Sequence, residues 1–177
     1  MVKFRILSFD VHAKGYERGK LFNEIYGYSR KTSVKKYFYP GLLHGMPWVR
    51  LGMSVIAVPR ESSFAVEEFL RKAEKEKKLT LYAFDTELPS DLRDRAMENY
   101  LGSLNILREM ERAEEIAKKG RVPKKMIKEL KLLIKEAKKV DVSDKKHITK
   151  ALQKRLGAIK GGRISVITSR LKRQREK

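Results

Sequence analysis

Asp10 and His12, in the segment "LSFDVHAK", are the first residues whose types and spacing could support chemistry. If this segment is a β-strand, residues i and i+2 project from the same face, so the carboxylate and the imidazole would lie side by side. Such a pair can hold a metal ion that activates water for phosphodiester cleavage. Mg²⁺ prefers more oxygen ligands than one Asp supplies, so this hypothesis also requires a second copy of the chain. Otherwise Asp10 ends a strand, caps a turn or pairs with a basic residue, and no cofactor is needed.

A second candidate site is Tyr26–Pro40, "YGYSRKTSVKKYFYP", which mixes four basic and five aromatic side chains. If residues 34–39 form a strand, Lys35 and Tyr37 lie on the same face. Basic side chains neutralise phosphates without reading sequence, and a Tyr ring can stack on an unpaired base. The alternative is that the tyrosines belong to the core or its rim and only the lysines are in solvent. The candidate nucleic-acid-binding residues of this stretch are Arg30, Lys31, Lys35 and Tyr37.

The third candidate site is the C-terminal segment, which holds more than half of the net charge of +20. Residues 145–177 carry 12 basic side chains and 1 acidic side chain. A basic run is often only a solvated surface, but here acidic residues are almost absent across a whole predicted helix. Gly161-Gly162 predicts a flexible break, so that the tail can order on a partner. The candidate phosphate contacts are Lys154, Arg155, Lys160, Arg163, Arg170, Lys172, Arg173 and Arg175.

The composition limits the class of protein. A pI of about 10.1 fits a polyanionic partner, of which nucleic acid is the best match. The chain has no cysteine, which excludes disulfides, zinc–thiolate sites and cysteine nucleophiles. We find no phosphate-binding loop, dinucleotide fingerprint or nucleophile elbow, so a binding protein is favoured over an enzyme. No signal peptide or membrane-spanning run is recognised, which predicts a cytoplasmic protein. The abundance of Lys, Arg and Glu is typical of thermophiles.

Apolar patterning predicts an α+β fold in three parts. Strands are expected at 3–11, 33–43, 47–59 and 79–86, with helices at 16–27 and 64–78. The resulting order β-α-β-β-α-β is that of a ferredoxin-like domain, in which two helices cover one face of an antiparallel sheet. Further helices are expected at 91–119, 124–140 and 144–159. The predicted parts are a ferredoxin-like domain (1–88), a helical extension (89–160) and a basic, flexible tail (161–177).

Four segments resemble a known group of proteins: "LSFDV", "RLGMSVIAVP", "SSFAVEEFL" and "LTLYAFD". In order and residue type, residues 3–86 are similar to the small ferredoxin-like subunit of CRISPR spacer integration and to the N-terminal domain of chromate-resistance regulators. The resemblance implies a homodimer that contacts duplex DNA through basic residues, with a divalent metal near the dimer axis at Asp10. The sequence departs from this group in its long second-strand region and in its additional helical residues.

Three hypotheses for function follow. The first is a nucleic-acid-binding protein that contacts phosphates with little sequence specificity, with duplex DNA favoured over RNA. The second is a nuclease that uses Mg²⁺ at Asp10 in a dimer. The third is an assembly protein that binds a protein partner through residues 91–140. A membrane-surface role is the least supported, because the last helix has only a modest apolar face and no aromatic residue.

Overall fold

The computed structural model describes residues 2–160 and has an α+β fold. The chain divides into two compact units, Met1–Ser103 and Leu104–Lys177. Within the described residues, all strands belong to the first unit, and the second unit is helical. The boundary predicted after residue 88 therefore differs from the observed one, because the helix that follows residue 88 belongs to the same unit as the sheet. The predicted tail, 161–177, lies outside the described residues, as do its candidate contacts Arg163, Arg170, Lys172, Arg173 and Arg175.

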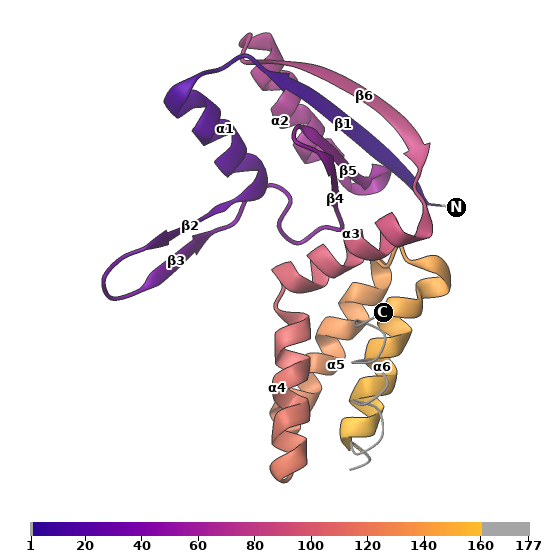
Figure 1. Cartoon of the computed structure of the whole chain (residues 1–177). Coiled ribbons are helices and arrows are strands. Elements are labelled where there is room, and N and C mark those ends of the chain that lie inside the picture. Colours follow the sequence, from indigo (N-terminus) through magenta and orange to yellow (C-terminus); the bar gives the residue numbers. More distant parts are fainter. Residues whose placement is uncertain (1, 161–177) are drawn as a thin grey trace, which may run out of the picture. The chain divides into compact units, whose positions relative to one another are not determined.

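The first unit is built on a four-stranded antiparallel sheet with the order β4-β5-β1-β6 (Figure 1). Its strands are β1 (Lys3–Val11), β4 (Val49–Gly52), β5 (Val55–Pro59) and β6 (Leu79–Glu87). The two inner strands, β1 and β5, are rich in large apolar residues. Phe4 and Leu7 project from opposite faces of β1 and both are fully buried, so β1 is buried on both faces.

Two helices, α1 (Gly15–Tyr26) and α2 (Phe64–Lys75), cover one face of this sheet. Leu21 and Ile25 of α1 are buried with the β1 residues Leu7 and Phe9. The apolar stripe of α2, with Val66, Leu70 and Ala73, completes the same core. A third helix, α3 (Ser90–Ser103), contacts β4, and Asn99 Nδ2 donates a hydrogen bond to the carbonyl of Trp48 at 2.8 Å.

The predicted second and third strands of this region are wrong in detail. The segment 33–43 does not join the main sheet. Its residues Lys36–Tyr39 form β3, which pairs with β2 (Tyr28–Lys31) in a separate two-stranded hairpin between α1 and β4. The segment 47–59 is not one strand, because the chain turns after Gly52 and forms the antiparallel pair β4–β5.

The second unit contains α4 (Ile106–Lys119), α5 (Lys124–Lys139) and α6 (His147–Lys160), which contact one another. The single helix predicted at 91–119 is wrong. It is interrupted before α4 at Asn105, whose φ of 55° is left-handed, a conformation that Asn tolerates better than most residues. None of the helices in residues 2–160 has the length and apolar character needed to cross a membrane.

Asp141, just before α6, is a buried acidic residue whose two carboxylate oxygens both accept hydrogen bonds. One carboxylate oxygen accepts bonds from the backbone and hydroxyl of Ser143, and the other accepts bonds from the backbone and hydroxyl of Thr149. A buried carboxylate is tolerated when it is satisfied in this way. Asp141 therefore fixes the start of α6 relative to the loop that follows α5.

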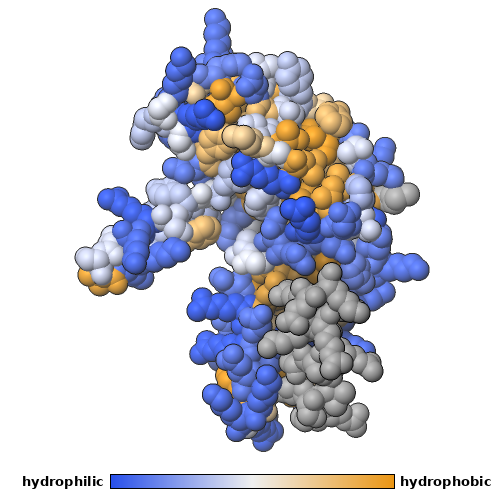
Figure 2. All heavy atoms as spheres, in the orientation of Figure 1, coloured by the Kyte–Doolittle hydropathy of each residue, from blue (hydrophilic) through white to orange (hydrophobic). Residues whose placement is uncertain are grey.

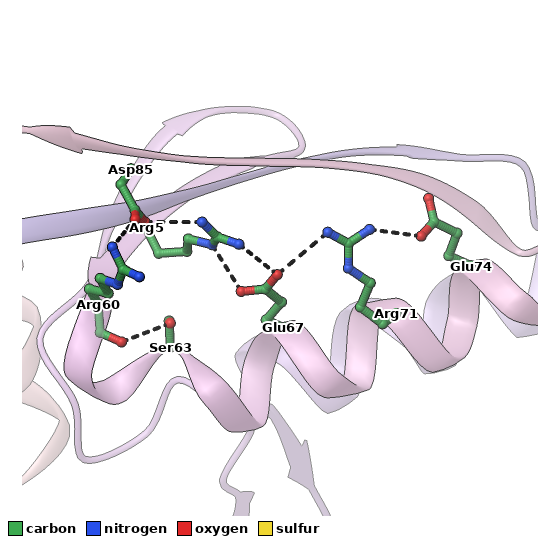
Figure 3. Close-up of polar contacts among 7 residues, drawn as sticks. All are labelled: Arg5, Arg60, Ser63, Glu67, Arg71, Glu74 and Asp85. Carbon is green, nitrogen blue, oxygen red and sulfur yellow. Dashed lines mark hydrogen bonds and ion pairs between the residues drawn. The ribbon is translucent and has the colours of Figure 1, made fainter.

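A row of alternating charges joins α2 to the sheet (Figure 3). Arg5 of β1 donates two hydrogen bonds to Glu67 of α2, each at 2.9 Å, and one to Asp85 of β6 at 3.1 Å. Arg60 also pairs with Asp85. On the other side of Glu67, Arg71 bridges to Glu74 at 3.1 Å. Because these bonds connect β1 to two elements that are distant from it in sequence, they fix α2 against β1 and β6.

Two carboxylates of this row have lowered pKa values. Hydrogen bonds from Arg5 lower the pKa of Glu67 below its usual range, because they favour the ionised form. Glu74 accepts a hydrogen bond from the backbone N–H of Leu81 at 2.8 Å, which lowers its pKa as well. Leu81 lies on the edge strand β6, so Glu74 also satisfies an edge N–H group that has no neighbouring strand.

We expect Glu67→Gln to destabilise the first unit by roughly 1–2 kcal/mol at pH 7, since it removes a charge-assisted pair of hydrogen bonds. A folded-state pKa below the unfolded value of about 4.3 stabilises the fold above that pH, and this stabilisation is lost as the pH falls through the folded-state pKa. The variant should therefore lose less stability than wild type on acidification. Urea unfolding from pH 3 to 7, followed by the fluorescence of the single tryptophan, Trp48, measures this.

Glu68→Gln is the control, because Glu68 is the exposed neighbour of Glu67 on α2. It should change the free energy of unfolding by less than about 0.5 kcal/mol. Equal effects of the two substitutions, or an unchanged acid dependence in Glu67→Gln, would contradict the role assigned to the Arg5–Glu67 pair.

Candidate functional site

The β2–β3 hairpin projects from the body of the first unit, and it contains the aromatic and basic stretch singled out in the sequence (Figure 1). Every residue from Tyr28 to Pro40 is exposed. The visible side of the hairpin is mostly hydrophilic, with a hydrophobic spot at its outer end (Figure 2). Val34, in the loop at this end, is 92% exposed.

The base of the hairpin is a direct contact between two backbone segments at Gly27 and Gly41. A Cβ atom on Gly27 would lie 2.5 Å from the carbonyl oxygen of Tyr39 and 2.6 Å from the nitrogen of Gly41. A Cβ atom on Gly41 would lie 2.2 Å from the nitrogen of Gly27. Gly27 also has a φ of 76°, which only glycine adopts readily. Both positions therefore require glycine.

Hydrogen bonds continue this contact into the core. The N–H of Leu42 donates to the carbonyl of Glu24 at 2.8 Å, and the N–H of Leu43 donates to that of Ile25 at 3.1 Å. Ile25 and Leu43 are both buried. The chain segment that leaves the hairpin is thus bound to the last turn of α1, from which the hairpin starts. The hairpin is anchored at its base although its strands are exposed.

The tip is closed by Thr32 and Lys35. The Thr32 hydroxyl donates to the carbonyl of Lys35 at 2.8 Å and accepts from its N–H at 3.0 Å, while the Thr32 N–H donates to the same carbonyl at 2.9 Å. A side chain that bonds to the backbone across a loop in this way restricts the loop to one turn conformation.

The strand register separates the hairpin into two faces. Tyr28 lies opposite Tyr39, and Arg30 lies opposite Tyr37, so these four side chains share the first face. Ser29, Lys31, Lys36 and Phe38 share the second face. The sequence predicted Lys35 and Tyr37 on one face of a strand at 34–39, but β3 begins at Lys36, so Lys35 lies before the strand. Lys31 and Lys36 are direct cross-strand partners, an arrangement of like charges that destabilises a free hairpin.

Aromatic contacts stabilise this otherwise solvated ribbon. The rings of Tyr28 and Tyr39 stack with centroids 4.7 Å apart and planes inclined by 12°. Lys35 Nζ lies 5.5 Å from the centre of the Tyr37 ring, within the range of a cation–π contact. Even so, Tyr37 is 45% exposed and Phe38 is 56% exposed. The alternative interpretation placed the tyrosines in the core or at its rim. Tyr28, Tyr37 and Tyr39 are not in the core, whereas Tyr26, the first residue of the stretch, packs against it.

The positive charge of the hairpin is not neutralised by ion pairs with the part of the chain that the structure describes. Arg30, Lys31, Lys35 and Lys36 are exposed, and no ion pair joins any of them to a carboxylate within residues 2–160. A two-stranded ribbon without a core of its own is only marginally stable in water. The exposed aromatic rings and the basic residues without an ion pair in residues 2–160 make the hairpin the candidate site of the first unit.

The candidate phosphate-binding residues of the second unit differ in their exposure and in their ion pairs. Lys154 and Lys160 are exposed on α6. Arg155 is partly buried and donates two hydrogen bonds to Glu114 of α4, at 2.8 and 3.0 Å. This bidentate pair ties α6 to α4, so Arg155 is less suited to a phosphate than the two lysines.

Asp10 and His12 do not form a metal centre with other residues of the described chain. Asp10 is exposed near the end of β1. His12 Nε2 lies 2.8 Å from the hydroxyl of Thr80, with which it forms a hydrogen bond. Residues 2–160 contain no group of three or more side chains that could together hold a metal ion. The magnesium hypothesis at Asp10 stays a prediction that depends on a second chain.

Sequence reasoning did not select Tyr28, Lys36, Phe38 or Tyr39, nor the glycines at the hairpin base. The available signal was the pair of four-residue runs "YSRK" and "KYFY" around "TSVK". This signal is weak, because neither run alternates between apolar and polar residues and the connection lacks the glycine that hairpin loops of three to five residues usually contain. No protein-family model matches the chain, and searches of curated proteins and of solved structures find no significant match.

We expect Gly27→Ala to destabilise the first unit by roughly 2–4 kcal/mol, because it adds a backbone clash to the cost of a positive φ. Two glycines supply controls. Gly45 has a similar φ of 77° but open space around it, so Gly45→Ala should show the cost of φ alone, about 1 kcal/mol. Gly19 lies inside α1 with open space, so Gly19→Ala should stabilise by about 0.5–1 kcal/mol. Urea unfolding followed by Trp48 fluorescence measures all three, and similar values for Gly27→Ala and Gly45→Ala would contradict the close contact.

Proposed function

We propose that this protein binds duplex DNA through phosphate contacts with little sequence specificity, and that the β2–β3 hairpin is its principal contact surface. The observation that carries the proposal is the hairpin itself, an anchored ribbon with four exposed basic residues and exposed aromatic rings. No acidic residue occurs between Tyr28 and Pro40, so the ribbon has no internal competitor for a phosphate.

The shape of the hairpin favours B-form DNA over RNA. The major groove of B-DNA is about 12 Å wide and admits a two-stranded β-ribbon, whereas the major groove of an RNA duplex is deep and narrow. In a groove, the basic residues on both faces of the ribbon would meet phosphates on its two sides. The tyrosines would then supply apolar contact area, and Tyr37 would also support the position of Lys35.

The strand order also suggests a fold for the first unit. We propose that the first unit is a ferredoxin-like domain, because its strand order β4-β5-β1-β6 with α1 and α2 on one face is that of the split β-α-β arrangement. The β2–β3 hairpin is then an insertion before the second strand of that arrangement. Lys154, Lys160 and the basic residues of 161–177 are proposed as additional phosphate contacts.

The test is a triple variant, Arg30→Gln, Lys31→Gln and Lys35→Gln, in the full-length protein. We expect weaker binding to a labelled DNA duplex and a less steep log–log salt dependence, by up to about 2.7 if all three residues contact phosphates at about 0.9 each. Fluorescence anisotropy across a salt series, with and without Mg²⁺, measures both quantities.

The matched control is Lys75→Gln, Lys118→Gln and Lys119→Gln, which removes three exposed charges elsewhere, from the ends of α2 and α4. It leaves the net charge at +17, from +20, just as the hairpin variant does. If the two triple variants had the same salt dependence, only the total charge would matter and the hairpin would not be the contact surface. Preference for an RNA duplex would contradict the choice of DNA.

A further inference from the structure

The helix α5 carries a straight row of lysines on its outer face. Lys124, Lys128, Lys131, Lys135 and Lys138 follow one another at intervals of four, three, four and three residues. Because an α-helix has 3.6 residues per turn, such spacing keeps all five on one face. All five are exposed. We call this surface the α5 lysine row.

The other sides of α5 are already used. Leu130, Ile134 and Ala137 are buried in the helical unit. The two acidic residues of the helix, Glu129 and Glu136, project to one side of the row, and Glu136 pairs with Lys139 at 2.6 Å. In residues 2–160, no carboxylate forms an ion pair with any lysine of the row. The row is therefore a surface of one charge sign.

Such a row is unfavourable for the free helix. Like charges three or four residues apart destabilise a helix by about 0.2–0.5 kcal/mol per pair. The neighbouring helix α4 avoids this cost, because its four basic residues are matched by four acidic ones, with a pair between Arg112 and Glu109. Within this unit α4 is thus balanced in charge, whereas α5 has seven basic and two acidic residues and α6 has four Lys or Arg and no acidic residue.

We propose that the α5 lysine row binds the phosphate backbone of duplex DNA as a second contact surface, separate from the hairpin. From Lys124 to Lys138 the helix rises through 14 residue steps, or about 21 Å at about 1.5 Å per step. Over that length B-DNA presents about a dozen phosphates, so each flexible lysine side chain has phosphates within reach. The inference takes its class of partner from the proposed function but does not depend on the hairpin.

The geometry of α5 argues against a membrane as the partner. A helix that lies on a membrane inserts an apolar face into the lipid boundary next to its basic residues. The apolar face of α5 is occupied by its contacts with α4 and α6, and the one large apolar side chain of α5 that is exposed is Leu132. A linear polyanion needs only the charged row.

The first test is the full-length triple variant Lys128→Gln, Lys131→Gln and Lys135→Gln. We expect its log–log salt dependence for duplex DNA to be less steep than that of wild type by up to about 2.7. The Lys75, Lys118 and Lys119 triple variant has the same net charge and should retain most of the wild-type slope. Equal slopes for these two variants would overturn the inference.

The second test needs no substitution, so it does not depend on how a variant folds. Full-length protein is acetylated with a lysine-reactive ester, with and without saturating duplex DNA, and the modified lysines are quantified by mass spectrometry. Lys128, Lys131 and Lys135 should be protected at least several-fold by DNA, while Lys75 and Lys118 should not change. Protection by phosphatidylserine vesicles or polyglutamate, but not by DNA, would overturn the inference in favour of another partner.

The outcomes separate this inference from the proposed function. If the hairpin variant binds like wild type but the α5 variant does not, the row is a DNA contact and the hairpin proposal fails. If only the hairpin variant is weakened and DNA does not protect the row, the present inference fails alone. If wild-type protein does not bind duplex DNA, both are overturned.

Discussion

The contact between the backbones at Gly27 and Gly41 determines where the candidate site stands. Neither strand of the hairpin packs on a core, so its direction is set where it leaves α1 and where it returns toward β4. At that point there is no room for a side chain, and two backbone hydrogen bonds follow, one of which joins the buried residues Leu43 and Ile25. The energy that positions the hairpin therefore comes from the sheet domain. Because the side chains of the hairpin do not pack in a core, their types are not constrained by the stability of the fold and can be those that suit the proposed partner.

Several acidic residues make contacts that stabilise the fold, whereas the basic residues of the two proposed surfaces have no carboxylate partner in residues 2–160. The carboxylates of Glu67, Glu74 and Asp85 are used inside the first unit, where they hold α2 against the sheet. In the second unit, Glu114 binds Arg155, and Asp141 fixes the start of α6. No acidic residue occurs between Tyr28 and Pro40, and within residues 2–160 no lysine of the α5 lysine row forms an ion pair with a carboxylate. A chain with 22 acidic residues can thus present surfaces that are wholly positive, because many of its acids have structural contacts.

Much of the fold could be predicted because its elements bury apolar residues in regular patterns. The strands β1 and β6 and the helices α2 and α5 follow from such patterns. The hairpin could not, because every side chain in β2 is exposed and apolar alternation is absent. The break at Asn105 was missed for the opposite reason, since apolar residues keep helical spacing across it. The sequence alone shows that the candidate site combines basic and aromatic residues. It does not show which of them are neighbours, because the pairing of Tyr28 with Tyr39 depends on the register of the two strands.

The exposed aromatic rings of the hairpin have a consequence for the protein without a partner. Such rings favour association between copies of the chain, and a net charge of +20 opposes it by mutual repulsion. Salt screens that repulsion, with a Debye length of about 10 Å at 0.1 M and about 3 Å at 1 M. Under the proposed function, the ionic conditions that release the DNA would therefore also lower the barrier to self-association. Colloidal stability and the proposed binding would then be coupled through the same surface.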